Sequence, residues 1–318
     1  MSNKVKETDV VIIGAGPVGL FAVFELGLLD MKCDVIDILD KPGGQCAELY
    51  PDKPIYDIPG IPEISGGELT KSLLEQIKPF NPRFHLSTIV SELKQINNDL
   101  WEVVTDSDKI VHTKVIVIAA GGGSFQPKKP PIDGIDDYEG KSVFYSIKNI
   151  EKFYNKEIAI VGGGDTAIEE ATYLAKICNN VTMLVRKDHF RASKAMQNRL
   201  SNYDNIKVLF NHEVMEVMGE NVVDGLKIKS NLTNDVSELK ITGLFIAIGH
   251  SPNTDIFKGI VDMDDSGYIL TDKTSTKTNI PGVFAAGDVQ DKDYRQAVTA
   301  AGTGCMAALD AERYLQEI

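Results

Sequence analysis

Three glycines near the N-terminus have the types and spacing that hold a dinucleotide. Gly14, Gly16 and Gly19 follow an apolar run at residues 10–13 in the order G-x-G-x-x-G. In such a turn the first glycine permits the tight bend, the second lets the backbone approach a pyrophosphate, and the third allows the next helix to pack closely on the strand. The phosphate then lies at the positive end of that helix. These glycines predict a dinucleotide-binding turn.

A carboxylate stands where such a turn needs a ligand for ribose. Residues 32–37 (KCDVID) predict a second buried strand that ends at Asp37. An acidic residue is expected roughly 20 residues after the glycines, where it hydrogen-bonds the ribose hydroxyls. The glycines alone would be a weak indication, and a glycine-rich turn in another kind of α/β protein is the alternative.

A second glycine turn follows in the middle of the chain. Gly162 and Gly164 come after an apolar run at residues 158–161, Ala167 takes the third small position, and a helix is expected from Thr166. The same physical reasoning predicts a second dinucleotide site.

The second site differs from the first in the charge that follows its next strand. Residues 181–185 end in Arg186 and Lys187, with Arg191 close behind, where the first motif ends in Asp37. A carboxylate favours a ribose diol, whereas cationic side chains clamp a 2′-phosphate, so the second site is predicted to select NADPH. An exposed basic turn without a ligand is the alternative.

The loop at residues 41–60 (KPGGQCAELYPDKPIYDIPG) contains too much Gly and Pro for regular structure, yet it carries Gln45, Tyr50, Tyr56 and Asp57. Long irregular loops in compact domains are usually functional. A bulky cofactor would supply the partners that the polar groups of this loop need.

Regular elements that would position these residues can be read from the hydrophobic periodicity. A helix is expected within residues 65–79, ended by Pro79, and Trp101 is expected to pack in a core. Residues 88–93, 101–105 and 109–112 predict an antiparallel meander, and further strands are expected at residues 114–119, 207–209, 225–228, 244–248 and 283–286. A last helix is expected to begin near residues 295–297.

Two Gly- and Pro-containing stretches mark crossings between domains. Residues 121–131 and the stretch that contains Gly249 and Pro252 each follow a buried-type strand. The expected division is a discontinuous first domain, residues 1–120 with 249–318, and a second domain, residues 121–248.

Composition limits the classes of function. The chain has 318 residues, a net charge of −13, and four cysteines with no C-x-x-C pair. This charge argues against a nucleic-acid binder. Neither a signal-like apolar segment nor the ~18 apolar residues of a membrane helix is found, so a cytoplasmic location is expected.

The motifs together resemble the small two-domain flavoprotein reductases of the thioredoxin reductase type. The N-terminal part, with GAGPVG, GGQCAELYP, IYDIPG and AAGGGSFQPKKPP, is similar to the thioredoxin-reductase-like ferredoxin–NADP reductases. The part from about residue 157, with VGGGDTAIEEATYLA, GLFIAIGHSPNT and PGVFAAGDV, resembles thioredoxin reductase itself. The resemblance implies an α/β fold of two Rossmann-like, three-layer ββα nucleotide-binding domains, a discontinuous FAD domain and a homodimer.

The resemblance also implies which residues bind the cofactors. The expected FAD ligands are Gly14, Gly16, Pro17, Gly19, Asp37, Gly44, Gln45, Tyr50, Asp57, Val90, Gly121, Phe125, Gly287, Asp288, Arg295, Gln296 and Ala297. The expected NADPH ligands are Gly162, Gly164, Asp165, Thr166, Arg186, Lys187 and Arg191. No side chain is expected to be catalytic, because flavin N5 takes up the hydride, and no metal is expected.

Two departures from the family patterns bear on the electron acceptor. Thioredoxin reductase has a C-x-x-C dithiol just before its second glycine turn, but residues 140–157 contain no cysteine, so dithiol exchange by that route is excluded. The ferredoxin reductases usually continue into an extension whose aromatic residue covers the flavin, and this shield is expected to be missing after Ile318.

The sequence therefore predicts an FAD-dependent NADPH oxidoreductase that passes electrons to a one-electron carrier, ferredoxin or flavodoxin. An acidic carrier would dock on Lys128, Lys129, Lys141, Lys148, Lys152 and Lys156, unless these form an ordinary solvated face. One alternative is a thioredoxin reductase relative without its dithiol, acting as a diaphorase or as a degenerate or engineered disulfide reductase. Another is an NADPH or redox sensor without turnover.

Replacing all four cysteines by serine or alanine should leave NADPH-dependent reduction of ferredoxin and ferricyanide unchanged, because no thiol takes part in electron transfer. Thioredoxin should not be reduced by the parent or by the variant. The measurement is the initial rate with each acceptor. Robust thioredoxin turnover in the parent that disappears in the variant would contradict the prediction.

Overall fold

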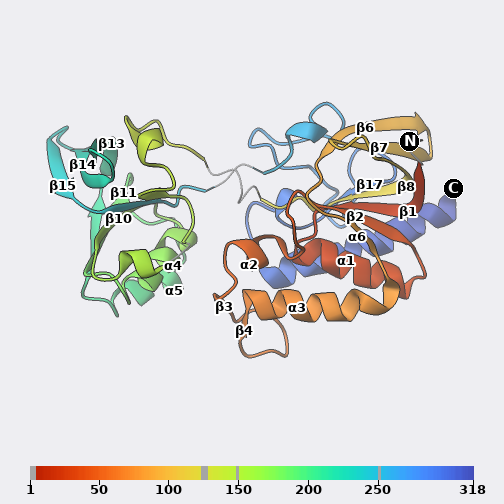
Figure 1. Cartoon of the computed structure of the whole chain (residues 1–318), viewed down its shortest axis with the longest axis horizontal. Helices are drawn as coiled ribbons and strands as arrows, with labels where there is room; N and C mark the ends of the chain where they lie inside the picture. Colours follow the sequence, from red (N-terminus) through yellow and green to blue (C-terminus); the bar gives the residue numbers. More distant parts are fainter. Residues whose placement is uncertain (1–4, 123–127, 148–149, 250–251) are drawn as a thin grey trace. The chain divides into compact units, whose positions relative to one another are not determined.

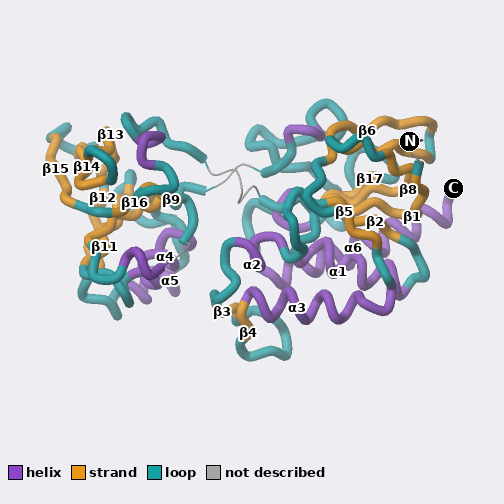
Figure 2. The backbone as a smooth tube through the Cα atoms, viewed as in Figure 1, coloured by secondary structure: helices purple, strands orange, loops and turns teal. Residues whose placement is uncertain are grey.

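The computed structural model describes residues 5–122, 128–147, 150–249 and 252–318. The chain forms two compact units, Met1–Gln126 with His250–Ile318 and Pro127–Gly249. Both units contain parallel strands and helices (Figure 1), with the helices and strands of each distinguished in Figure 2. The fold is α/β, as the sequence predicts. In the described residues, no helix is long and apolar enough to cross a membrane.

A seven-stranded sheet is the centre of the first unit. Its parallel part places β1 between β2 and β8, with Ile13 beside both Ile36 and Ile118 in the register. The carboxyl ends of these strands therefore meet at one edge, where ligands bind in open α/β sheets. The parallel strands are β1 (Lys6–Ile13), β2 (Cys33–Ile36), β5 (Arg83–His85), β8 (Ile110–Ile118) and β17 (Val283–Ala285). The antiparallel strands β6 (Val90–Asn97) and β7 (Leu100–Thr105) continue from β8.

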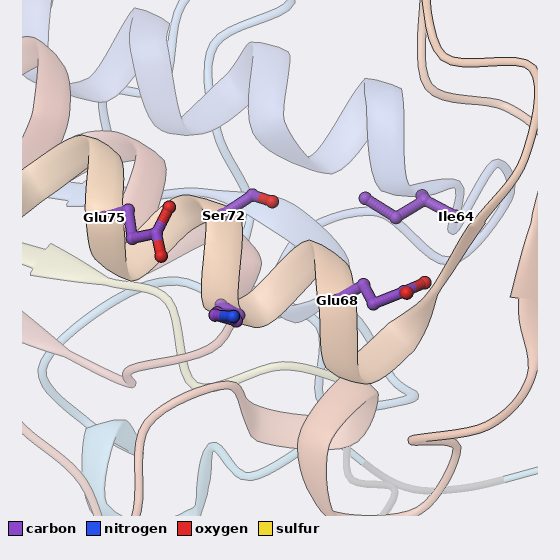
Figure 3. Close-up of a pocket in the computed structure, with 5 residues that line it drawn as sticks. Ile64, Glu68, Ser72 and Glu75 are labelled. Carbon is purple, nitrogen blue, oxygen red and sulfur yellow. The ribbon is translucent and has the colours of Figure 1, made fainter.

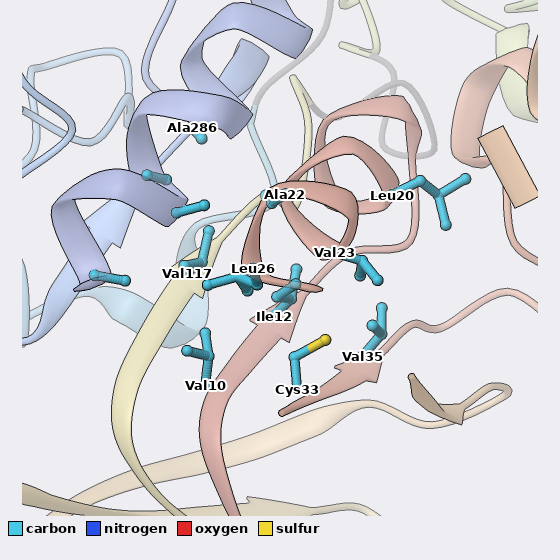
Figure 4. Packing of buried hydrophobic residues seen from close by; sticks show 14 of the residues in the cluster. Val10, Ile12, Leu20, Ala22, Val23, Leu26, Cys33, Val35, Val117 and Ala286 are labelled. Carbon is cyan, nitrogen blue, oxygen red and sulfur yellow. The ribbon is translucent and has the colours of Figure 1, made fainter. Parts of the chain in front are cut away.

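Helices cover one face of this sheet and pack closely on it (Figure 4). Helix α1 is apolar around most of its circumference because it packs against the sheet and against two other helices. At Gly304 a Cβ would lie 2.6 Å from the carbonyl oxygen of Val18, so a small residue lets α6 approach α1. The helices are α1 (Pro17–Leu28), α2 (Gly44–Glu48), α3 (Gly66–Ile77) and α6 (Ala297–Glu317).

The opposite face of the sheet is covered by a second apolar cluster, which includes Trp101, Val103 and Phe257. Trp101 is buried, as predicted for a packing residue. The parallel strands thus lie between the helices on one face and, on the other, an apolar cluster to which β6, β7 and residues 257–269 contribute.

The second unit repeats this plan on a smaller scale. Its parallel sheet has the order β12-β11-β10-β16-β9. Helices pack on one face and a three-stranded antiparallel sheet on the other. The parallel strands are β9 (Val143–Phe144), β10 (Glu157–Val161), β11 (Asn180–Val185), β12 (Ile206–Phe210) and β16 (Gly243–Ile246), and the helices are α4 (Asp165–Leu174) and α5 (Lys194–Leu200). The antiparallel strands are β13 (His212–Gly219), β14 (Val223–Ser230) and β15 (Val236–Lys240).

Three sequence predictions of elements need correction. The strands expected at residues 109–112 and 114–119 are one strand, β8, because Thr113 and its neighbours stay in the ladder with β1 and β7. The loop at residues 41–60 is not wholly irregular, since it contains α2 and β3 (Pro54–Ile55), which pairs with β4 (Ile64–Ser65). Strands β13 and β15 were not predicted, because their many polar residues hide the alternation. Short 3₁₀ turns complete the chain at Lys78–Phe80, Ile135–Tyr138, Ile150–Phe153, Asp255–Phe257 and Gly287–Val289.

A buried ionic cluster fixes the edge of the first sheet. Asp34 is fully buried in β2, with His85 Nε2 2.7 Å from Oδ2 and Arg83 Nε donating to Oδ1 at 2.8 Å. Burial alone raises the pKa of Asp34, but the hydrogen bonds from His85 and Arg83 outweigh it and leave this pKa below its usual value. The ionised carboxylate is therefore part of the folded state.

Asp34→Asn should lower the free energy of unfolding by about 1 to 3 kcal/mol near neutral pH, because the buried His85 ring loses its ionised hydrogen-bond partner. Since the folded pKa is lowered, the contribution of Asp34 is present above the unfolded pKa of about 3.9 and is lost as the pH falls through the folded pKa. Urea unfolding at several pH values measures this difference. Asp52→Asn, at an exposed position, is the matched control, and equal losses in both variants would contradict the prediction.

Candidate dinucleotide-binding sites

Backbone packing makes glycine obligatory at two positions of the first turn. Gly14 has φ +114°, and a Cβ there would lie 2.2 Å from the carbonyl oxygen of Ala119. At Gly19 a Cβ would lie 2.0 Å from the oxygen of Gly14, so the helix packs directly on the turn. At Gly16 the nearest atom to a Cβ would be Gly44 Cα at 3.9 Å, and no side chain of the described residues caps the α1 N-terminus. The helix end thus keeps its N–H groups for an anion.

A second glycine pair lies against this turn. Gly43 N donates to Ala15 O at 2.8 Å. Gly44 has φ +54°, and a Cβ there would lie 2.9 Å from Gly16 Cα. The loop expected to be functional therefore closes over the turn through backbone contact. Gly43 was not singled out from the sequence, although its neighbour was.

The Asp37 carboxylate is held by the turn itself. Oδ2 accepts a hydrogen bond from Ala15 N at 2.5 Å and Oδ1 accepts one from Leu39 N at 2.8 Å. Burial raises the pKa of Asp37 overall, and the two backbone hydrogen bonds oppose this rise. A carboxylate offers about four acceptor positions, so one on each oxygen remains for a ribose diol.

Apolar side chains missed by the sequence reasoning flank Asp37. Ile38 is 58% exposed and Ile89 is 47% exposed, although both are large and apolar. Thr88 N donates to the Asp37 carbonyl at 3.0 Å, which brings the segment before Ile89 alongside. Exposed β-branched side chains beside the residue that binds a ribose can pack against the face of the nucleotide base attached to that ribose. Their signal in the sequence is an apolar residue directly after the acidic one.

Two further carboxyls gather at the same end of the sheet. Asp288 follows β17, and a Cβ on Gly122 would lie 3.2 Å from its Cβ. Burial raises the pKa of Asp288 to about 6, and the charge of Arg295 opposes this rise. A Cβ on Gly121 would lie 3.8 Å from Gln45 Nε2, so the loop that contains Gln45 and Asp57 reaches this end of the sheet.

The Asp57 side chain has a buried oxygen that could accept a hydrogen bond from a polar ligand. Its Oδ2 is buried, and no hydrogen-bond partner is found in the part of the chain that the structure describes. A buried acceptor without a partner costs free energy unless a ligand supplies the donor. Together with the room beside Gly16 and the remaining acceptor positions of Asp37, this fits the hydroxyl-rich FAD.

The other residues expected at the first site lie in several segments of the chain. Gln45 Nε2 would be 3.8 Å from a Cβ on Gly121, and Gly287, at φ +76°, packs against Val18. Arg295 has φ +50° and stacks over the Tyr268 ring. The Tyr50 ring lies beneath the Lys53 ammonium group. Pro17 is the first residue of α1, and Val90 is the first residue of β6 and is buried. Gln296 is the N-cap of α6, and Ala297 is the first residue of that helix. Phe125 lies outside the described residues.

The second turn repeats the backbone geometry of the first. Gly162 has φ +154°, and a Cβ there would lie 2.4 Å from the carbonyl oxygen of Ala247. In the part of the chain that the structure describes, no atom lies within 4 Å of a Cβ on Gly164, and no side chain caps the α4 N-terminus there. Ala167 is fully buried in the third small position, and Thr166 lies exposed in the first turn of α4.

The cationic loop after β11 is anchored to the rest of its unit. Arg186, Lys187 and Arg191 are exposed, and among the described residues none of them forms an ion pair with a carboxylate. Asn231 Nδ2 donates to Arg186 O at 3.2 Å, and Arg191 N donates to Gly163 O at 2.7 Å. Three positive charges are thus presented beside the glycine turn on a fixed backbone.

The lysines expected to dock a carrier are not equivalent. Lys129 is paired with Asp136, at 3.1 Å, and with Glu139, so its charge is already balanced. Lys141 Nζ donates to Asp137 O. Lys128, Lys152 and Lys156 are exposed, and Lys148 lies outside the described residues.

The four thiols are free and poorly suited to exchange. Burial raises the pKa of Cys33 to about 12 and those of Cys46 and Cys178 to about 11, and it also raises the pKa of Cys305. Reactive cysteines need a lowered pKa, because the thiolate is the nucleophile. Cys33 and Cys178 are buried.

A shallow hollow on the outer face of α3 is separate from both turns. Its lining side chains project from the helix and from β4 into solvent (Figure 3). They are Ile64, Glu68, Lys71, Ser72 and Glu75. Glu68 and Ser65 also form the capping box of α3, so this face has a structural role.

Comparison with protein families and curated proteins gives matches over almost the whole chain. The model of the pyridine nucleotide-disulphide oxidoreductase family matches residues 8–304. A protein of Nitrobacter winogradskyi named ferredoxin--NADP reductase is 45% identical over 99% of this chain and 93% of its own length. One of the same name from Parvibaculum lavamentivorans is 44% identical over 91% of this chain and 85% of its length.

Solved structures with the same fold carry a different name. Thioredoxin reductase of Lactococcus lactis, in its FR conformation, has a TM-score of 0.90 and 32% identity, with 98% of this chain and 100% of that chain covered. Thioredoxin reductase of T. acidophilum has a TM-score of 0.88 and 27% identity, with 98% and 99% covered.

Gly44→Ala should reduce the amount of FAD that copurifies, because the new Cβ would push against Gly16 Cα at 2.9 Å and close the turn. The measurement is the ratio of flavin to protein absorbance, before and after addition of free FAD. Gly302→Ala is the matched control, since a Cβ there meets nothing within 4 Å. A fully yellow Gly44→Ala variant would show that the loop does not form part of the site.

Proposed function

The chain belongs to the pyridine nucleotide-disulphide oxidoreductase family, and from this membership we propose that it is an FAD-dependent reductase that carries electrons from NADPH to ferredoxin. The observation that carries the proposal is the contrast between its two turns. The first is followed by the buried carboxylate of Asp37, and the second by the exposed cations Arg186, Lys187 and Arg191. One turn suits a ribose diol and the other a 2′-phosphate.

Each unit then has one cofactor. Residues 1–126 with 250–318 form the FAD-binding unit, and residues 127–249 form the NADPH-binding unit. This assignment follows from which glycine turn each unit contains. It makes the FAD-binding unit discontinuous in sequence.

In the first unit the chain binds and orients FAD. The α1 N-terminus would hold the pyrophosphate and Asp37 the adenosine ribose, and Asp288 and Asp57 would accept hydrogen bonds from further hydroxyl groups of FAD. When bound, FAD supplies the redox chemistry that the side chains lack, since it takes up a hydride and releases electrons singly. No protein acid or base is required.

In the second unit the chain recognises NADPH by charge. The α4 N-terminus, open at Gly164, holds the pyrophosphate, and Arg186, Lys187 and Arg191 bind the 2′-phosphate. Asp188 lies among these cations and pairs with His189 at 2.5 Å. Its hydrogen bond with His189 lowers the pKa of Asp188, so this carboxylate stays ionised and reduces the local positive charge.

The choice of acceptor rests on the names of the curated relatives and on the thiols. The relatives that match nearly the full chain are named ferredoxin--NADP reductase. The chain lacks a C-x-x-C pair, and its four thiols have raised pKa values. We extend the proposal to flavodoxin as a second carrier, to a homodimer, and to a cytoplasmic location, where free thiols are usual.

A second candidate is supported by the similarity to solved thioredoxin reductases. A relative of those enzymes without the dithiol would act as a diaphorase or as a degenerate disulfide reductase. An NADPH sensor would bind both cofactors and show no turnover. Initial rates of NADPH oxidation with ferredoxin and cytochrome c, with thioredoxin and a disulfide reagent, and with ferricyanide separate the three. We expect turnover with the first and third, and turnover of thioredoxin above that of ferredoxin would contradict the proposal.

Replacing Arg186 and Arg191 with alanine should lower kcat/KM for NADPH by about ten-fold or more, because a hydrogen bond to a charged group contributes roughly 1.5 to 3 kcal/mol. The value for NADH should change little, since NADH has no 2′-phosphate. Steady-state kinetics with both cofactors gives the comparison, and Arg199→Ala in α5 is the matched control. Equal losses for both cofactors would mean that these residues do not read the phosphate.

A further inference from the structure

The Asp165 carboxylate lies at a helix N-terminus where a bound phosphate would repel it. Asp165 is the first residue of α4, next to the open N-terminus at Gly164 where the proposed function puts the NADPH pyrophosphate. The positive end of the helix dipole stabilises a carboxylate in the first turn of a helix. A phosphate bound at the same helix end would be stabilised by the same dipole and repelled by the carboxylate. Its presence needs another explanation than direct contact with the nucleotide.

The structure directs this carboxylate toward the cationic loop. Oδ1 of Asp165 accepts two hydrogen bonds from Ser193, one from its backbone N and one from its Oγ, both at 3.0 Å. Ser193 Oγ in turn accepts a hydrogen bond from Met196 N and so caps α5. One carboxylate oxygen therefore joins the start of α4 to the start of α5.

The segment between these helices includes one of the proposed phosphate ligands. Arg191 N and Ala192 N donate to the same Gly163 carbonyl, at 2.7 and 3.2 Å. Ala192 is buried in the hydrophobic core of its unit, which fixes the position of this segment. The Gly163 carbonyl and the Asp165 carboxylate thus hold residues 191–193 against the glycine turn.

We propose that Asp165 is a positioning residue that sets the preference for NADPH over NADH by holding Ser193, and through it Arg191, beside the second glycine turn. This inference rests on the proposed function of that turn. It reassigns Asp165, since the sequence predicts a direct NADPH ligand there. Because Arg191 acts only on the 2′-phosphate, the effect of Asp165 is selective for the phosphorylated cofactor.

The test measures binding of NADP⁺ and NAD⁺ by titration calorimetry. Asp165→Ala should raise the Kd of NADP⁺ about ten-fold and leave that of NAD⁺ within about two-fold, as expected for loss of a hydrogen bond to a charged group. Asp165→Asn should stay within about three-fold of the parent, because its side-chain oxygen still accepts from Ser193. Asp204→Ala, which removes another exposed carboxylate of the unit, is the control.

A double-mutant cycle tests whether Asp165 acts through Arg191. If it does, Asp165→Ala adds little to Arg191→Ala, so the two effects are not additive. Equal changes for both nucleotides, tighter binding of both, full additivity, or an unchanged preference in Asp165→Ala would overturn the inference. A parent protein that binds neither nucleotide would overturn the proposed function instead, which keeps the two failures apart.

Discussion

Both nucleotide turns depend on the same contact between two backbones. The first glycine of each turn lies against a carbonyl oxygen just beyond a neighbouring strand, Ala119 for Gly14 and Ala247 for Gly162. A Cβ would come within 2.4 Å of that oxygen or closer, so no other residue lets the strand turn at that point. The direction of the helix that follows, and with it the place of its N-terminus, is set by this approach. Every other part of each site is arranged around that helix end.

The two units use this common frame with opposite electrostatics. In the first, a buried carboxylate is stabilised by backbone N–H groups and presents its free acceptor positions to hydroxyls. In the second, exposed cations lie on a loop whose backbone forms hydrogen bonds with Gly163, Asp165 and Asn231. A diol is recognised by a hydrogen-bond acceptor with fixed geometry that is shielded from water. A phosphate dianion, in contrast, is attracted by several solvent-exposed positive charges.

The sequence was sufficient to predict most of the parallel strands, both turns and the fold class, because each rests on local patterns, but the short parallel strands β5 and β9 were not predicted. Apolar runs ending in glycine and the charge after the next strand are visible without a structure. The sequence could not predict that the backbone of Gly44 approaches Gly16 or that Ile38 and Ile89 are exposed. It also could not predict that Ser193 donates a hydrogen bond to Asp165. These depend on segments far apart in the chain, and the amphipathic pattern of β13 and β15 is too weak to mark them as strands.

The return of the chain to the first unit has a consequence for how the protein is made. Strand β17 completes the edge of the first sheet beside β8, and the buried Asp310 of α6 accepts hydrogen bonds from Thr276 N and Oγ1. All of these residues leave the ribosome after the continuous unit 127–249. The first unit therefore cannot be completed until the inserted unit has been made, because strand β17 and helix α6 come after it in the chain. N-terminal domains generally fold first during synthesis, but here the N-terminal unit includes residues that are made last.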